Sequence, residues 1–248
     1  MAMTTRPTDA RPTAAPPSGN LALFDLDHTL IPFDSGMAWT QFLVERGRLP
    51  AEAEDQYLSF CHQYVAGTLD IHAMHRANLQ PLLQFPREML GLWLREFENQ
   101  MAARLPADMR ELLQRHADRG DLCVIVTATE RLIAEPFARQ FGVGHLIATE
   151  AATVDGLPGS ALTGEIDGEP CYREQKVSRV ERWLAARPAG SAQRLSDFTR
   201  SWFYSDSIND LPLLSAVSHP VAVRPDERLR AHALASVWRV IDRVINPV

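Results

Sequence analysis

A run of four apolar residues, Leu21 to Phe24, is followed at once by two carboxylates, Asp25 and Asp27. An uninterrupted apolar run is typical of a strand buried on both faces. Carboxylates at the end of such a strand are costly to desolvate, and a spacing of two places them on the same side of an extended chain. Like charges held that close repel unless a cation lies between them or one keeps its proton. The stretch therefore predicts a divalent metal and an acid–base role, with an Asp-containing turn as the alternative.

Further apolar runs also end in polar residues, and helical patterns separate them. Leu122 to Val126 runs into Thr127, and Trp202 to Tyr204 runs into Ser205 and Asp206. Strands that alternate with helices form a parallel sheet with right-handed crossovers, and ligands bind at the carboxyl ends of its strands. The sequence therefore predicts an α/β fold with a Rossmann-like parallel sheet flanked by helices. The polar residues expected at its strand ends are Asp25, Asp27, Thr127, Asp206 and Asp210.

Residues 35–104 differ from the rest because apolar residues recur there at helical spacing, without strand alternation. We predict a small α-helical cap domain over 35–104, inserted after the first strand. The catalytic core then comprises residues 20–34 and 105–248, and a chain of 248 residues accommodates a core with an insert of this size. Residues 1–19, rich in Thr, Ala and Pro, are predicted to be a disordered tail.

Charge and composition exclude several classes of function. A net charge of −6 argues against nucleic-acid binding, because phosphate backbones repel an acidic protein. A small phosphorylated molecule is compatible with it if positive charge is concentrated in one pocket. No apolar run approaches the length of a membrane span, about 18 residues, so no membrane partner is expected. Three cysteines without paired spacing favour a reducing compartment, and we expect a cytoplasmic protein. The sequence does not predict an oligomeric state.

The chain contains 24 arginines and a single lysine, Lys176. A coding bias explains the many arginines and leaves the one exception unexplained. Lysine is a compact point charge, whereas arginine is a planar fork. Lys176 is therefore a candidate for a tight site in which arginine does not fit.

Four motifs, in this order, make the sequence resemble the haloacid dehalogenase-like superfamily, and within it the branch of phosphoserine phosphatase. Asp25-Leu-Asp-His-Thr-Leu30 is similar to the Asp-x-Asp-x-Thr signature, and Val124-Ile-Val-Thr127 to the hydrophobic strand that ends in Ser or Thr. Lys176 corresponds to the motif lysine, and Ser205-Asp-Ser-Ile-Asn-Asp210 to the acidic fourth motif. The resemblance covers residues 21 to 223 and includes a small helical cap after the first motif.

The resemblance implies a mechanism that uses the two carboxylates differently. Asp25 is expected to attack phosphorus and form an aspartyl-phosphate. Asp27 is expected to protonate the leaving alkoxide and then to act as base on the hydrolytic water. Phosphoryl transfer requires positioning and charge neutralisation. The resemblance implies that Thr127 and Lys176 hold phosphoryl oxygens. It also implies that Asn209 contacts the phosphate or supports a residue that does.

The resemblance also implies a magnesium ion, a hard cation that prefers oxygen ligands. It is expected to bridge Asp25, a phosphate oxygen and Asp206, together with the backbone carbonyl of Asp27. Asp210 is expected to bind the ion directly or through water. Thr29 is expected to order the turn rather than to contact substrate.

Residues of the cap are the candidates for substrate choice. Asp34 lies where phosphoserine phosphatases carry a Glu that contacts the substrate amine, and the alternative is a helix N-cap. Arg76 is a weaker candidate for binding a substrate carboxylate. His72 and His75 are three residues apart but lack further metal ligands nearby, so we expect a solvated or core role.

The favoured function is a magnesium-dependent phosphomonoesterase that acts on a small phosphorylated metabolite. A phosphotransferase or phosphomutase of the same superfamily and a non-catalytic phosphate-sensing protein are the alternatives. A haloacid dehalogenase is disfavoured, because that chemistry uses no metal and does not need Asp27. Phosphoserine, histidinol phosphate and other metabolites all fit. The name phosphoserine phosphatase is not assigned, because Asp34 replaces Glu and no cap arginine aligns convincingly.

Overall fold

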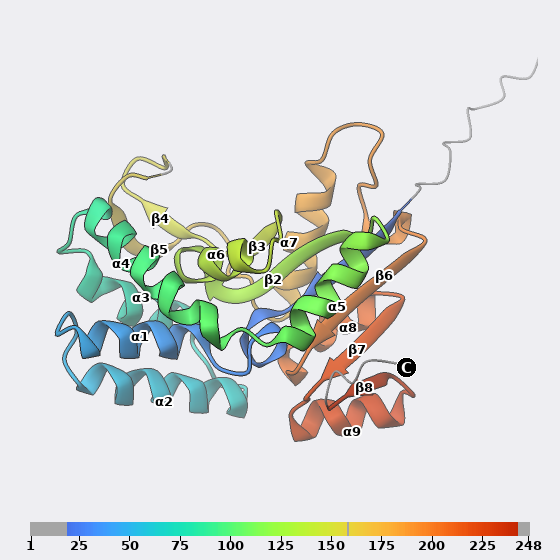
Figure 1. The fold of residues 1–248 in the computed structure, drawn as a ribbon, viewed down its shortest axis with the longest axis horizontal. Coiled ribbons are helices and arrows are strands. Elements are labelled where there is room, and N and C mark those ends of the chain that lie inside the picture. Colours follow the sequence, from blue (N-terminus) through green and yellow to red (C-terminus); the bar gives the residue numbers. More distant parts are fainter. Residues whose placement is uncertain (1–18, 158, 243–248) are drawn as a thin grey trace, which may run out of the picture.

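The computed structural model of the chain describes residues 19–157 and 159–242, and the predicted tail lies outside them except for Gly19. Within these residues a six-stranded sheet has the order β3-β2-β1-β6-β7-β8, and every neighbouring pair is parallel (Figure 1). The strands are β1 (Asn20–Phe24), β2 (Leu122–Glu130), β3 (Leu146–Thr149), β6 (Arg200–Ser205), β7 (His219–Val223) and β8 (Arg239–Ile241). The predicted α/β fold class is confirmed.

Alternate residues of β1 face the two sides of the sheet, and both sides are covered. Ala22 and Phe24 belong to the hydrophobic cluster that includes α5 (Ala107–Asp118) and α6 (Arg131–Gln140). Leu21 and Leu23 belong to a second cluster. That cluster includes α7 (Glu174–Ala185), α8 (Leu211–Ala216) and α9 (Glu227–Ala235). Burial on both faces explains why β1 reads as a continuous apolar run.

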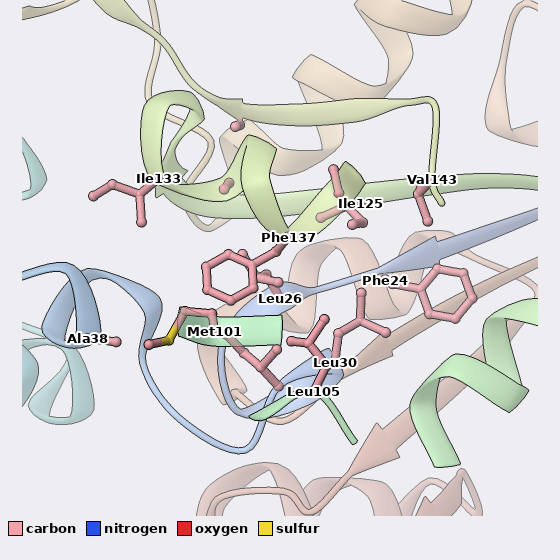
Figure 2. Packing of buried hydrophobic residues seen from close by; sticks show 14 of the residues in the cluster. Phe24, Leu26, Leu30, Ala38, Met101, Leu105, Ile125, Ile133, Phe137 and Val143 are labelled. Carbon is pink, nitrogen blue, oxygen red and sulfur yellow. The ribbon is translucent and has the colours of Figure 1, made fainter. Parts of the chain in front are cut away.

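Four α-helices lie between β1 and α5 in sequence, and Figure 1 shows them grouped on one side of the sheet. They are α1 (Ser35–Glu45), α2 (Glu52–Ala66), α3 (Ile71–Leu79) and α4 (Arg87–Met101). Phe97 of α4 meets Phe137 of α6 edge to face, with ring centroids 5.8 Å apart. Figure 2 shows Phe137 beside Leu26 and Met101, within one continuous cluster. This packing fixes the helical segment against the sheet.

Two features of the chain differ from the sequence-based expectation or extend it. The strand expected to end at Thr127 continues to Glu130, because its last residue still pairs with Thr149 of β3. The glycine-rich region after β3 forms an antiparallel pair, β4 (Ala151–Thr153) with β5 (Leu162–Ile166). The extension of β2 carries additional polar side chains toward the helices that precede α5.

No helix in the described part of the chain is both long and apolar enough to span a lipid bilayer.

Candidate active site

The turn at Leu26–Leu30 follows β1, and hydrogen bonds tie it to Asp206 at the end of β6. His28 adopts a φ of 55° within it, so the chain reverses sharply after Asp27. The Thr29 hydroxyl donates to Asp206 Oδ1 at 3.1 Å and accepts from the Asp206 backbone N–H at 3.0 Å. Thr29 thus orders the turn, as its sequence position predicts, and places Asp25 and Asp206 at one edge of the sheet.

Lys176 lies between two buried carboxylates. Its Nζ atom is 2.8 Å from Asp25 Oδ1 and 2.7 Å from Asp210 Oδ1, and all three side chains are at most 10% exposed. Burial raises the pKa of Asp25 to about 7; Lys176 opposes this increase, and Asp210 and Asp27 add to it. For Lys176, burial favours the neutral amine, but the charges of Asp210 and Asp25 outweigh it and raise the pKa well above its usual value. The lysine is therefore a fixed positive charge beside Asp25.

Asp27 is oriented by two donors rather than by a cation. Its Oδ1 atom accepts from the backbone N–H of Ser35 at 2.6 Å, and its Oδ2 atom accepts from the Thr129 hydroxyl at 2.5 Å. Ser35 begins α1, and Thr129 lies on the extension of β2. The carboxylate of Asp27 is thus held between β2 and the start of α1.

Thr127 and Asn209 are buried near these carboxylates but differ in their contacts. Thr127 lines the cavity described below, and its hydroxyl accepts from the Thr129 backbone N–H at 3.1 Å. The amide of Asn209 is engaged at both ends, donating to the Tyr64 carbonyl at 3.0 Å and accepting from Arg173 Nε at 3.3 Å. Both side chains line the cavity, and Asn209 in addition connects α2 to the start of α7.

Asp206, like Asp27, has no cationic partner among the described residues, in contrast to Asp25 and Asp210. Burial raises its pKa well above the usual value, and the nearby Asp25 and Asp210 raise it further. Among the described residues no cationic side chain forms an ion pair with it, whereas Lys176 pairs with both Asp25 and Asp210. Asp210 also accepts from the Ser205 hydroxyl at 2.7 Å.

The donor set fits a hard divalent cation, because it consists of closely spaced carboxylates with an excess of negative charge. As the side chains stand, no three carboxylate, imidazole or thiol groups in residues 19–157 and 159–242 form a ready metal cage. Lys176 accounts for this in part, since it occupies the space between Asp25 and Asp210. Asp206 is the side chain that such a cation would compensate.

A cavity of about 520 Å³ opens over these residues. Thr127 of β2 lines it together with Asp25, Asp27 and Asp206, which follow the ends of β1 and β6, and α2 and α3 contribute a mostly apolar wall. Asp34 also lines it.

Asp34 is the N-cap of α1, with its Oδ1 atom accepting from the Met37 N–H at 2.7 Å and from the Tyr57 hydroxyl at 2.9 Å. Burial raises the pKa of Asp34 to about 6, and the charge of Asp27 adds to this increase. The capping role and a position in the cavity therefore coexist. Arg76 does not line the cavity, because it pairs with Glu165 at 3.2 Å on the surface.

Several residues of the site escaped the sequence-based assignment. Thr129 and Ser35 hold Asp27, and Tyr57 holds Asp34. His75, expected to be solvated or in the core, lines the cavity together with Glu130. Only Thr129 had a sequence signal, since it lies two residues beyond Thr127 on the same face of an extended chain.

The chain matches the family model described as haloacid dehalogenase-like hydrolase over residues 22–215. It is 39% identical to a histidinol-phosphatase of Neisseria meningitidis over 225 residues, which cover 90% of this chain and 98% of that protein. It is 32% identical to phosphoserine phosphatase SerB1 of Mycobacterium tuberculosis, covering 89% and 70% of the two chains.

Solved structures resemble the chain as well. A Bordetella pertussis protein of unknown function aligns with a TM-score of 0.81 and 41% identity, covering 92% of this chain and 99% of that one. A substrate-bound phosphoserine phosphatase aligns with a TM-score of 0.63 over 91% and 94% of the two chains. Its 17% identity makes it a likeness of fold alone.

Proposed function

The chain belongs to the haloacid dehalogenase-like hydrolases, and from that premise we propose that it is a magnesium-dependent phosphomonoesterase that works through an aspartyl-phosphate on Asp25. Its relatives named as phosphatases place it among the phosphatases of the family. The observation that carries the mechanism is the buried contact of Asp25 with Lys176, 2.8 Å apart, next to Asp27, which faces the same cavity. A nucleophile, a fixed cation and a proton carrier thus lie together.

In the first half of the reaction an Asp25 oxygen attacks phosphorus, and the bond from phosphorus to the ester oxygen breaks. Asp27 gives its proton to the departing alkoxide. Lys176 and the Thr127 hydroxyl bind phosphoryl oxygens and hold the group in line. The raised pKa of Asp25 reflects burial beside like charges, and the positive charge of Lys176 favours the ionised form that attack requires.

In the second half a water molecule attacks the phosphorus of the aspartyl-phosphate, and Asp27, now ionised, takes its proton. The bond between phosphorus and Asp25 breaks, which releases phosphate and restores the carboxylate. The hydrogen bonds from Ser35 and Thr129 keep the Asp27 carboxylate in one orientation for both proton transfers.

The ion would be held by Asp25, Asp206 and the Asp27 backbone carbonyl, with Asp210 directly or through water. When bound, it would supply positive charge to the phosphoryl oxygens and to Asp25. The support for this assignment is the uncompensated charge of Asp206 beside two other buried carboxylates.

Helices α1 to α4 are proposed to act as the cap domain over residues 35–104, with residues 20–34 and 105–248 as the core. The cavity between the strand ends and helices α2 and α3 supports this division, because its walls come from both parts.

We further propose an amino-bearing substrate, with histidinol phosphate as the first compound to test. The histidinol-phosphatase of Neisseria meningitidis supports this choice, because it is 39% identical to this chain and the alignment covers 98% of its length. The cavity also offers little to a substrate carboxylate, since Arg228 is the one arginine among its described lining residues and Arg76 is paired elsewhere. Phosphoserine, which carries a carboxylate, is the comparison substrate.

The test is hydrolysis of p-nitrophenyl phosphate, histidinol phosphate and phosphoserine with magnesium and with EDTA. We expect turnover with magnesium, loss with EDTA, and abolished turnover in Asp25→Asn with unchanged circular dichroism. Asp167→Asn, an exposed aspartate outside the cavity, is the matched control. Retained activity in Asp25→Asn would refute the mechanism. Phosphate appearing on an added alcohol rather than in solution would point to a transferase.

A further inference from the structure

His75 and Glu130 form a buried pair in the wall of the cavity, apart from the proposed catalytic residues. His75 lies on α3, and Glu130 is the last residue of β2. Their side chains are 2% and 6% exposed. His75 Nδ1 lies 2.9 Å from Glu130 Oε1, although the contact does not meet the geometry of a hydrogen bond.

The outer atoms of the pair have no partner in the described part of the chain. His75 Nε2 and Glu130 Oε2 are buried and make no hydrogen bond, although both residues line the cavity. Buried polar atoms are normally paired, and each exception calls for an explanation. The proposed reaction uses neither residue, so it leaves this exception unexplained.

The chemistry of the two atoms indicates what would satisfy them. With a proton on the Nδ1 atom that faces the carboxylate, His75 presents its Nε2 atom as an acceptor. Glu130 Oε2 is a carboxylate oxygen and therefore also an acceptor. A carboxylate beside a second acceptor suits a group that donates N–H bonds, most strongly a positively charged one, because charge-assisted hydrogen bonds are the stronger ones.

The position of the pair also suits one end of a small substrate. Glu130 follows Thr127 by three residues along β2, and three extended residues span at most about 10 Å. The pair therefore lies within the length of a small organic phosphate from the place where Thr127 would meet the phosphoryl group. The aromatic side chains of Phe60 and Tyr64 line the same cavity.

We propose that Glu130 and His75 form a second subsite of this cavity, which determines specificity by binding a cationic N–H group, an imidazolium or an ammonium, on the leaving group of the substrate. The inference rests on the proposed phosphatase function and deepens it. It selects phosphate esters of nitrogen-bearing alcohols over neutral or carboxylate-bearing ones. Asp34, the N-cap of α1, already offers a carboxylate to the cavity, and the proposed subsite on α3 and β2 adds a second place where a donor can bind.

A purely architectural role is the rival explanation. The pair joins α3 to β2 and could serve only to fasten the inserted helices to the sheet. Loss of such a fastening would lower the turnover of all phosphate esters by the same factor. A subsite for a cationic group would lower turnover selectively.

The test measures kcat/KM for histidinol phosphate and for p-nitrophenyl phosphate, which has no nitrogen cation, in wild type, Glu130→Gln and His75→Gln. His72→Gln, an exposed residue on the same helix, is the matched control. We expect the ratio of the two kcat/KM values to fall about tenfold or more in both variants, mainly through a higher KM for histidinol phosphate, because an unpaired polar site rejects the wrong partner strongly. Circular dichroism and thermal unfolding show whether Glu130→Gln and His75→Gln are folded. If one of them is not, the other alone is used to test the proposal.

Each outcome decides the proposal. An equal loss for both esters, or no loss, overturns the subsite while p-nitrophenyl phosphate hydrolysis by the wild type still supports the phosphatase. If the wild type hydrolyses neither ester, the proposed function fails and the subsite is judged by calorimetry with histidinol. A dissociation constant about tenfold weaker in Glu130→Gln supports the subsite, and an unchanged or undetectable affinity overturns it.

Discussion

Replacing Lys176 by Met should destabilise the protein far more than removal of an ordinary ion pair. Lys176 Nζ lies 2.8 Å from Asp25 and 2.7 Å from Asp210, and its own side chain is 2% exposed. Met keeps much of the length and apolar volume of the side chain but removes the charge. The variant therefore leaves two buried carboxylates without their counterion.

The expected loss in the free energy of unfolding is about 3–5 kcal/mol, the usual cost of removing one partner from a buried pair. With a urea slope of about 2 kcal/mol/M, the unfolding midpoint falls by about 2 M. The loss should also depend on pH. Burial already raises the pKa of Asp25 to about 7, and Lys176 opposes that increase, so the pKa rises further without the lysine. When a carboxyl has a raised pKa in the folded state, the free energy of unfolding of the protein falls as the pH rises through that pKa. The difference in this free energy between wild type and Lys176→Met should therefore be smaller at pH 5 than at pH 8.

The assay is urea unfolding in EDTA, followed by tryptophan fluorescence and by circular dichroism so that coincident transitions verify two-state behaviour. Arg182→Met is the matched control, because Arg182 lies on the same helix and pairs with Glu169 at 3.0 Å with both side chains more than half exposed. Exposed pairs of this kind contribute about 0–1 kcal/mol. Equal losses in the two variants, or a Lys176→Met deficit that does not change with pH, would refute the electrostatic reasoning.

Three further predictions concern single side chains. Thr129→Val removes the hydroxyl that donates to Asp27 at 2.5 Å, and steady-state kinetics should show kcat lowered about tenfold or more with little loss of stability. Gly36→Ala puts a methyl group against the Tyr57 ring, and thermal unfolding should report about 1–3 kcal/mol of destabilisation. Burial lowers the pKa of His116, so the stability that depends on its neutral form is present above about pH 6.5 and is lost as the pH falls. The stability difference between wild type and His116→Gln should therefore shrink between pH 7 and pH 5.

The fold class followed from the sequence because burial leaves a local pattern. Residues Leu21 to Phe24 of β1 are fully buried and appear as four apolar residues in a row, and the glycines after β3 mark the turns of the β4–β5 pair. Boundaries that depend on distant partners left no such pattern. β2 continues to Glu130 because Thr149 of β3 pairs with it, and nothing within 122–130 distinguishes that extension from a loop.

The same distinction separates the parts of the site that could be read from those that could not. Asp25, Asp27 and Lys176 were predictable as candidates because charge is conspicuous in an apolar run or in a chain with one lysine. Ser35, one of the two partners of Asp27, was not, because it contributes only its backbone N–H and any residue type offers the same donor. Asp34 was ambiguous for a related reason, since a helix cap and a cavity carboxylate use the same side chain at the same position.

His75 and Glu130 illustrate why substrate choice is harder to read than chemistry. They are 55 residues apart in sequence, and each has an ordinary alternative, a helix-face histidine and a glutamate before a helix. Their significance arises only because α3 is packed over the end of β2, which excludes water from Nε2 and Oε2 at once. Catalytic carboxylates must lie where the sheet converges, so topology predicts them. Specificity contacts depend on how a second layer of helices meets that edge, and a one-turn shift of α3 would give a different pair of side chains without any change in the motifs.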